Sequence, residues 1–163
     1  MTGTPRVAVL DAIEYATVAT VSPAGWPWNS PVYFARDGAT FYWISRADAQ
    51  HSIHVRANGR AFIVIYDSTR EDTSGAAVYV DAEARELTDE QGIATALAAL
   101  YRRKGKPAPA ATGFLGPAPQ RVYAAAARQA WTNVLHTYGE LPWDERIVIS
   151  LTDGQPTSEE QET

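Results

Sequence analysis

Apolar and polar residues alternate along several short stretches of the chain, and Gly, Pro, Asn or Asp residues separate these stretches. A period of two predicts β-strands that present one face to a core. The clearest pair of strands meets at Asp37-Gly38, a dipeptide typical of tight hairpins between apolar runs. The strands predicted by this pattern are Ala16–Val21, Ser30–Ala35, Thr40–Ser45, Arg60–Tyr66, Ala76–Leu87 and Arg146–Leu151.

Apolar residues at helical spacing, together with start and stop signals, predict three helices between these strands. The second should begin after Asp48 as its N-cap and end at Asn58-Gly59. The third should follow a capping box at Thr88–Gln91. The predicted helices cover Pro5–Ile13, about Ala49–Ala57, and the stretch through Ile93 and Tyr101.

Length and composition limit the class of protein. The chain has 163 residues, 45% of them hydrophobic, which is enough for one domain with a core. A net charge of -5 argues against a nucleic-acid surface, and the lack of Cys excludes disulfides and thiolate metal sites. Neither a signal peptide nor a membrane-spanning apolar run is recognisable, so we expect a soluble cytoplasmic protein.

One point in the pattern suggests a site for an anion. The predicted strand ending at Ser45 leads almost directly into the helix near Ala49. A helix N-terminus offers free backbone N–H groups and a positive dipole end, which favour a phosphate. Ser45, Gln50 and His51 would add side-chain donors there.

The order of these motifs resembles the pyridoxamine 5'-phosphate oxidase-like split-barrel flavoproteins. The resemblance covers roughly residues 8–151 and rests on a helix, a strand, the turn SPAG, the strand SPVYF, the DG hairpin, an aromatic strand ending in Ser, a short helix, NGR and an apolar strand. It implies a mainly β fold with minor α, a six-stranded antiparallel split β-barrel with short flanking helices. It also implies a homodimer that binds FMN, or a deazaflavin or haem, between its subunits.

The resemblance also bears on the alanine-rich stretch Gln120–Thr132, whose composition alone leaves helix and strand open. RVYAAAARQAWTN is similar to the closing strands of the family, which predicts a strand over Arg121–Ala125, a turn, and a strand from Ala130. The domain would then cover residues 1–151, followed by a disordered acidic tail at 152–163.

The resemblance implies a cofactor phosphate at the start of the Ala49 helix and a ring along Asn29 to Val32. Arg70 and Thr73, in the loop after the Arg60–Tyr66 strand, would lie near the ring. The full set of implied cofactor-binding residues is Asn29, Ser30, Pro31, Val32, Ile44, Ser45, Ala49, Gln50, His51 and Trp131.

Several basic residues of the family's phosphate site are replaced here. Asn29, Phe34, Gln50 and His51 stand where Arg or Lys is common in the resembled enzymes. The vitamin B6 reaction itself is therefore not supported, although backbone amides, Ser45 and a protonated His51 can still hold a phosphate. Two hypotheses remain open: an FMN-dependent oxidoreductase of unknown substrate, and a non-catalytic barrel that binds flavin, deazaflavin or haem.

The remaining chemical groups say less. His51 and His54 have the spacing of a metal pair, but no carboxylate motif accompanies them, so we expect no zinc site. His136 is placed in a turn by its neighbours Tyr138-Gly139. Exposed tryptophans on a half-barrel predict a symmetric homodimer, and those concerned are Trp26, Trp28, Trp131 and Trp143.

Overall fold

Strands dominate the fold. The structure is a computed structural model that describes residues 5–69, 77–139 and 141–152. Its strands are β1 (Tyr15–Val21), β2 (Pro27–Asp37), β3 (Thr40–Arg46), β4 (Arg60–Tyr66), β5 (Ala77–Glu86), β6 (Gln120–Tyr138) and β7 (Leu141–Ile149).

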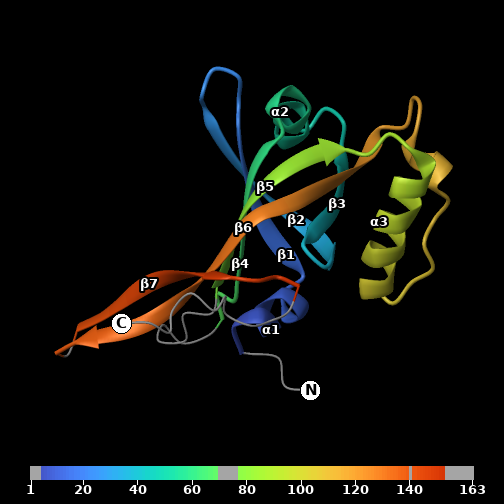
Figure 1. Cartoon of the computed structure of the whole chain (residues 1–163). Helices are drawn as coiled ribbons and strands as arrows, with labels where there is room; N and C mark the ends of the chain where they lie inside the picture. Colours follow the sequence, from blue (N-terminus) through green and yellow to red (C-terminus); the bar gives the residue numbers. More distant parts are fainter. Residues whose placement is uncertain (1–4, 70–76, 140, 153–163) are drawn as a thin grey trace.

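All strand pairs are antiparallel, and the strand order is β3-β2-β1-β4-β5-β6-β7 (Figure 1). β3 also pairs with β6, from Thr40 opposite Ala126 to Arg46 opposite Gln120. This extra pairing closes six strands into a barrel, while β7 extends the sheet beyond it. The predicted six-stranded split barrel is therefore confirmed, with a seventh strand added outside the ring.

The side chains that fill the barrel interior are mostly apolar. Burial alternates along the strands, as the sequence pattern predicted. In β1, for example, Ala16, Val18 and Thr20 are buried and their neighbours are more exposed. Trp43 and Tyr123 lie at the centre, stacked with ring centroids 5.6 Å apart. Burying a large apolar side chain is worth about 1.5–3 kcal/mol, so this interior is the main source of stability.

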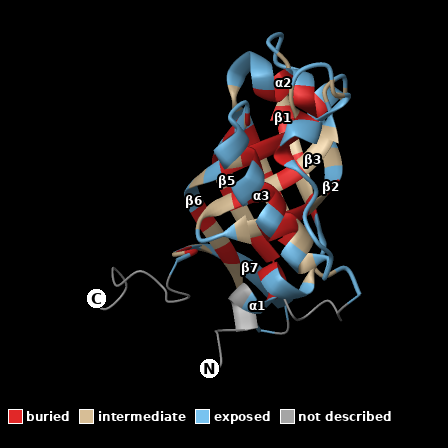
Figure 2. Cartoon of the chain, turned by 90° about the vertical axis from the view of Figure 1, so that its right-hand side faces the viewer, coloured by how far each residue is buried: buried red, intermediate tan, exposed pale blue. Residues whose placement is uncertain are grey.

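The helices are short and lie outside the barrel. They are α1 (Pro5–Ala12), α2 (Gln50–Asn58), α3 (Glu90–Arg103) and the 3₁₀ helix η2 (Ala111–Phe114). α2 lies at one end of the barrel, and α3 lies along its wall (Figures 1 and 2). Ile93 and Leu97 of α3 pack with Phe114 of η2 and Val122 of β6, so η2 is held to the barrel wall.

The basic end of α3 has a structural role. The Arg103 guanidinium donates to the carbonyl oxygens of Leu10, Asp11 and Ile13 at the end of α1. It also lies over the Phe34 ring, 4.5 Å from its centroid. A cation at exposed helix carbonyls is favourable, so this one side chain ties the two helices together.

Two predicted helix caps are wrong. Asp89, and not Thr88, caps α3, because the Asp89 carboxylate accepts a hydrogen bond of 2.6 Å from the Gly92 N–H. Asp48 does not cap α2. The N-cap is Ala49, and Asp48 instead accepts two hydrogen bonds from Arg46, of 2.8 and 2.7 Å. The predicted stop holds: Gly59 ends α2 in the left-handed region, with φ 69°.

β6 is one strand and contains neither a helix nor the turn predicted after Ala125. Its pairing with β5 shifts register instead, since Asp81 pairs with Gln129 and Ala82 with Ala127. Arg128 is left over between them, which is the geometry of a β-bulge. The bulge lets a single long strand serve both the barrel wall and the ribbon that follows.

That ribbon is formed by β6 beyond Thr132 together with β7, and we call it the β6–β7 arm. β5 pairs with β6 only as far as Val78 opposite Thr132, so residues 133–138 pair with β7 alone. The arm extends away from the barrel (Figure 1). His136 lies in this strand and not in a turn; its ring stacks on Trp143 at 4.6 Å and pairs with Glu145 at 2.8 Å. β7 also begins five residues before the strand predicted at Arg146.

Some predictions fall elsewhere. The contacts expected of Arg70 and Thr73 lie outside the described residues, as does the tail expected at 152–163 except for Thr152. Among the helices of the described part, none is long and apolar enough to cross a membrane.

Candidate functional site

The barrel is split between β2 and β3. These strands pair only from Phe34 opposite Trp43 to Asp37 opposite Thr40. The first half of β2, residues 27–33, therefore pairs with β1 on one side and with no described strand on the other. α2 lies at this end of the barrel and contacts both β1 and β2.

The unpaired side of β2 presents backbone groups at alternate residues. The Phe34 N–H donates to the Glu14 carbonyl, toward β1. Because successive residues of a strand point their N–H and C=O groups to opposite sides, those of Asn29, Pro31 and Tyr33 point to the unpaired edge. Of these, Pro31 has no N–H to offer. The edge thus offers backbone donors and acceptors to a planar, hydrogen-bonding ligand.

The side chains of the predicted ring segment are divided between two faces. Asn29 and Pro31 are exposed, while Val32 is buried in the core at 6% exposure. Ser30 is half-buried and accepts a hydrogen bond of 2.9 Å from the Trp28 indole N–H. If a ring lies along this segment, its polar contacts must come mainly from the backbone.

The N-terminus of α2 follows β3 after one tight turn, Arg46–Ala49. The Ala49 N–H donates to the Arg46 carbonyl at 3.2 Å. No side chain caps the helix, and its first turn carries no acidic residue. Helix geometry leaves the N–H groups of Gln50, His51 and Ser52 without partners inside the helix. These groups and the positive dipole end can accept an anion.

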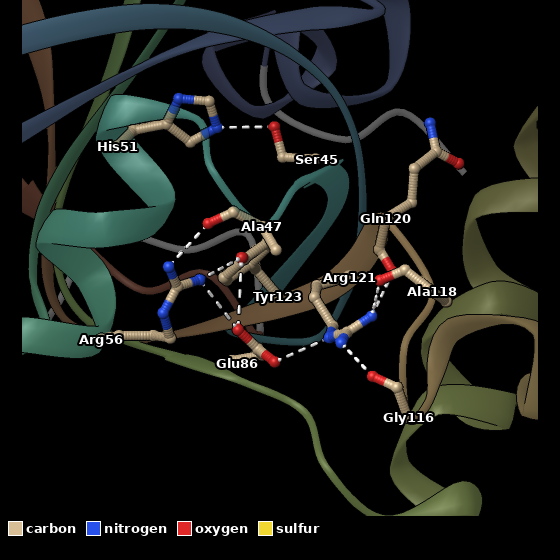
Figure 3. Close-up of polar contacts among 10 residues, drawn as sticks. All are labelled: Ser45, Ala47, His51, Arg56, Glu86, Gly116, Ala118, Gln120, Arg121 and Tyr123. Atoms are coloured by element: carbon tan, nitrogen blue, oxygen red, sulfur yellow. Dashed lines mark hydrogen bonds and ion pairs between the residues drawn. The ribbon is translucent and has the colours of Figure 1, made fainter.

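Ser45 and His51 meet at this corner (Figure 3). The Ser45 hydroxyl lies 2.6 Å from Nε2 of His51, and His51 is only 7% exposed. Burial, together with the nearby His54, lowers the pKa of His51 below its ordinary value. The prediction that His51 itself faces a phosphate is not supported by this placement, because its Nε2 is already engaged by Ser45.

Gln50 and His54 form a second contact one turn along α2. The Gln50 amide lies 2.7 Å from Nε2 of His54, and Nδ1 of His54 lies 3.1 Å from the Thr20 hydroxyl. Both nitrogens of this buried imidazole are therefore used. Because the Gln50 side chain is directed to His54, only the backbone N–H of Gln50 remains for an anion.

The two other predicted residues lie apart from this corner. Ile44 packs under α3, against the cluster that contains Ile93 and Val122. Trp131 is on β6 and stacks on Phe62 at 6.2 Å. β6 pairs with β3 only from Gln120 to Ala126, and Trp131 lies beyond Ala126, past the hairpin end of β3 and away from the split. The structure thus brings together Ser45, Ala49, Gln50 and His51, places Asn29–Val32 on the neighbouring edge, and does not bring in Trp131.

A polar network behind the corner was missed by sequence reasoning (Figure 3). Glu86 forms ion pairs of 3.1 Å with both Arg56 and Arg121. Arg56 also donates to the Ala47 carbonyl at 2.6 Å and to the Tyr123 hydroxyl at 3.2 Å. Burial is the main cause that raises the pKa of Tyr123. The network fixes the turn before α2 to β5 and β6.

Arg121 of this network lies at the start of β6 and also holds the loop before that strand. Arg121 donates to the carbonyl oxygens of Gly116 and Ala118. The only sequence signal for the network was a set of charged residues at strand ends, and such residues are usually solvated.

The outer face of β1, β4, β5 and β6 carries an apolar patch at Phe62, Val64, Tyr66 and Trp131, which no described helix covers. Tyr66 on this face is 50% exposed, and Phe62, Val64 and Trp131 are half-buried. The Arg146 guanidinium lies 3.9 Å from the centroid of the Tyr79 ring on the same face. A face of this kind suits contact with another protein surface.

A hollow lies at the far end of α2, away from the Ser45 corner. It has a volume of about 540 Å³ and is lined by Gly59, Arg60, Asp81, Glu83 and Arg128, among others. Its cations and carboxylates face one another; Arg128 and Asp81, for instance, are 3.9 Å apart. We place the candidate site at the split because the split, unlike this hollow, offers uncommitted backbone donors.

Fold and site together define a class: an antiparallel split barrel with an anion-accepting helix start beside an unpaired strand edge. The sequence profile described as Pyridoxamine 5'-phosphate oxidase matches residues 6–134, which is most of the chain. The chain belongs to this pyridoxamine 5'-phosphate oxidase-like split-barrel family. No curated protein matches it significantly in sequence.

Solved structures share the fold. A heme binding protein from Mycobacterium smegmatis has a TM-score of 0.65 at 18% identity, over 93% of this chain and 60% of that one. HutZ, the heme storage protein from Vibrio cholerae, has a TM-score of 0.65 at 18% identity, over 81% and 95%. An F420 reductase has a TM-score of 0.58 at 20% identity, over 79% and 98%. At these identities the likeness concerns the fold.

Proposed function

We propose that this chain binds a flavin-type cofactor, FMN or a deazaflavin, in the split beside β2 and the start of α2 and serves as an oxidoreductase for a small molecule. The observation that carries the proposal is the pairing of an uncapped helix start, next to Ser45, with the unpaired edge of β2. A flavin needs both, because one end of it is a phosphate and the other a flat ring with donors and acceptors.

The residues present fit such a group. The first-turn N–H groups of α2 and the Ser45 hydroxyl would hold the phosphate. The backbone of Asn29, Pro31 and Tyr33 would orient the ring edge. The cofactor, when bound, supplies the electron transfer, and the chain supplies position and exclusion of water. Catalysis by a protein side chain is not part of the proposal.

The phosphate site would be weaker than one built from arginines. Asn29 and Phe34 bring no positive charge, and the nearby Arg46 is bound to Asp48 by two hydrogen bonds. Charge-assisted hydrogen bonds are about twice as strong as neutral ones, so backbone donors alone give modest affinity. For the same reason, oxidation of pyridoxamine phosphate is not proposed.

A homodimer forms part of the proposal. The apolar outer face of β1, β4, β5 and β6 would be the contact, and the two splits would lie at its margins. Trp131 cannot reach the split of its own chain, so a role for it at the cofactor would require the split of the other subunit.

A second candidate is a non-catalytic barrel that carries flavin, deazaflavin or haem. The small positive charge at the corner favours it over a dedicated enzyme. Its haem form is disfavoured by the imidazoles: His54 has both nitrogens hydrogen-bonded, Nε2 of His51 meets Ser45, and His136 is paired with Glu145 on the arm. A haem iron that binds through Nε2 of any of the three would have to displace the contact at that atom.

The absorbance spectrum of the purified protein tests the proposal. Bound FMN gives absorbance bands at about 370 and about 450 nm, a deazaflavin gives one band at about 400–420 nm, and haem gives a Soret band. Anaerobic addition of NADPH then separates the two candidates, because an oxidoreductase bleaches its flavin band and a carrier does not. A protein that neither retains FMN nor binds it in titration contradicts the proposal.

A further inference from the structure

The direction of the hydrogen bond between His51 and Ser45 matters for any ligand that binds at the corner before α2. The two atoms are 2.6 Å apart, and the imidazole is nearly enclosed, with 7% exposure. The Ser45 hydroxyl itself is only half-buried and lies where β3 turns toward α2 (Figure 3). Ser45 can therefore reach a ligand, whereas Nε2 of His51 can act on that ligand only through Ser45.

A hydroxyl has a single proton to donate. If Nε2 of His51 carries no proton, it accepts the proton of Ser45, and the outward side of Ser45 offers only lone pairs. If Nε2 carries a proton, it donates to Ser45, and the Ser45 proton is free to point outward. A phosphate oxygen accepts hydrogen bonds and repels lone pairs, so only the second arrangement favours a phosphate.

We propose that His51 is a positioning residue that turns the Ser45 hydroxyl into a donor for a phosphate monoester at the start of α2. This inference rests on the proposed function for its ligand and deepens it by assigning the group that sets phosphate selectivity. His51 does not touch the phosphate; it acts through Ser45.

The charges around His51 set the direction of the pH effect. Burial and, after it, the nearby His54 on the same helix lower the pKa of His51, so His51 is neutral near pH 7 in the free protein. Arg46 and Asp48 in the preceding turn neutralise each other, and Glu86 lies between Arg56 and Arg121. Tyr123 of β6 is neutral near pH 7, and burial raises its pKa further above the ordinary value of 10.0.

A phosphate dianion at the corner adds a nearby negative charge and stabilises the imidazolium form. Phosphate binding should therefore take up protons and weaken as the pH rises from 7 to 9. Above pH 7 a phosphate monoester such as that of FMN is already a dianion, since its second pKa is about 6, so the pH dependence of FMN binding reports on the protein.

Inorganic phosphate is the first probe, followed by NMR of the His51 ring and of the backbone amides of residues 50–52. We expect phosphate to shift these amides and to move the His51 ring to the form with a proton on Nε2. In Ser45→Ala the amides should still respond, and the ring response should largely disappear. A phosphate-dependent amide shift with an unchanged His51 ring in the native protein would overturn the positioning role.

FMN and riboflavin, which differ by the phosphate, are the second pair of probes. His51→Phe should weaken FMN binding by about tenfold and leave riboflavin binding unchanged, because one charge-assisted hydrogen bond is lost. His51→Gln is the matched control: its amide N–H can donate to Ser45 at any pH. It should keep FMN affinity and remove the pH dependence. The double variant Ser45→Ala/His51→Phe should lose no more than Ser45→Ala alone.

These outcomes separate the two claims. A native protein that binds neither flavin but shows the phosphate response at His51 contradicts the proposed function and supports the positioning role. A native protein whose FMN affinity equals that of His51→Phe at every pH contradicts the positioning role. Absence of any phosphate response at residues 50–52 overturns it as well.

Discussion

Glu86 is the residue on which the corner before α2 depends most. Its carboxylate lies between the guanidinium groups of Arg56 and Arg121, 3.1 Å from each, with 16% of its side chain exposed. Arg56 in turn holds the carbonyl of Ala47. One carboxylate thus allows two like charges to lie close together near the barrel wall.

Replacement of Glu86 by Gln should destabilise the fold. The two guanidinium groups would lose their shared counter-charge, which we expect to cost about 2 kcal/mol or more. Urea denaturation would show this as a lower midpoint at an unchanged slope. Asp48→Asn is the control, because it breaks a shorter but exposed pair with Arg46 and should leave the midpoint where it is. Equal midpoints for Glu86→Gln and native protein would contradict this account.

His51 predicts how stability depends on pH in phosphate-free buffer. Its pKa in the folded chain is lower than the ordinary value of 6.5. Below that value the unfolded chain binds a proton that the folded chain does not, so stability should fall as the pH drops below 6.5. Thermal midpoints between pH 7.5 and 5 for native protein and His51→Gln would measure it. The two profiles should diverge only on the acidic side.

At the scale of elements, most of the fold could be predicted because its signals are local. The DG hairpin sets a two-residue loop between β2 and β3, and Gly59 ends α2 in the left-handed conformation. The structure of β6 could be predicted less well, because alanines fit a helix as well as a strand and because a bulge leaves no residue-type signal. The turn predicted after Ala125 does not form, and the β-bulge at Arg128 takes its place.

The start of α3 offers a test between two neighbouring residues. Asp89→Ala removes the side chain that accepts from the Gly92 N–H and should cost about 1 kcal/mol. Thr88→Ala is the matched control, since the sequence pattern predicted Thr88 as the cap and the structure gives it no such role. Denaturation midpoints that fall for Thr88→Ala and not for Asp89→Ala would show that the helix is capped as the sequence pattern predicted.

At the scale of the whole molecule, the outer face of the barrel remains without a partner in one chain. Val64 and Phe62 lie on it half-exposed, and Tyr66 is exposed. The sequence could indicate that such a face exists, through its tryptophans, but not where it lies. Trp131 proved half-buried against Phe62, whereas Trp26, Trp28 and Trp143 are exposed.

A charge at the centre of that face should separate the subunits. Val64→Lys should convert a dimer into a folded monomer, because a buried ammonium without a partner is strongly unfavourable at an interface. Ile53→Lys is the control: Ile53 is 43% exposed on α2, away from the face, and should leave the dimer intact. Sedimentation velocity at micromolar concentration measures both. A native chain that sediments as a monomer would contradict the dimer itself.

The candidate site could be predicted only in part, for a physical reason. The meeting of a strand end and a helix start is a matter of chain order, so Ser45, Ala49 and His51 were within reach. Side-chain direction was not, because it depends on what packs from distant strands. The Ser45–His51 contact and the Glu86 network required the closed barrel.

The unpaired edge of β2 also bears on how the chain behaves before it meets a cofactor. An exposed edge invites strands of other molecules, and this is how many β-proteins aggregate. Pro31 presents no N–H on that edge, so an incoming strand cannot form a continuous ladder there. The same proline that shapes a ligand edge thus protects the newly made, empty protein in solution. Its replacement by Val should make the cofactor-free chain prone to aggregate, and bound cofactor should suppress the effect.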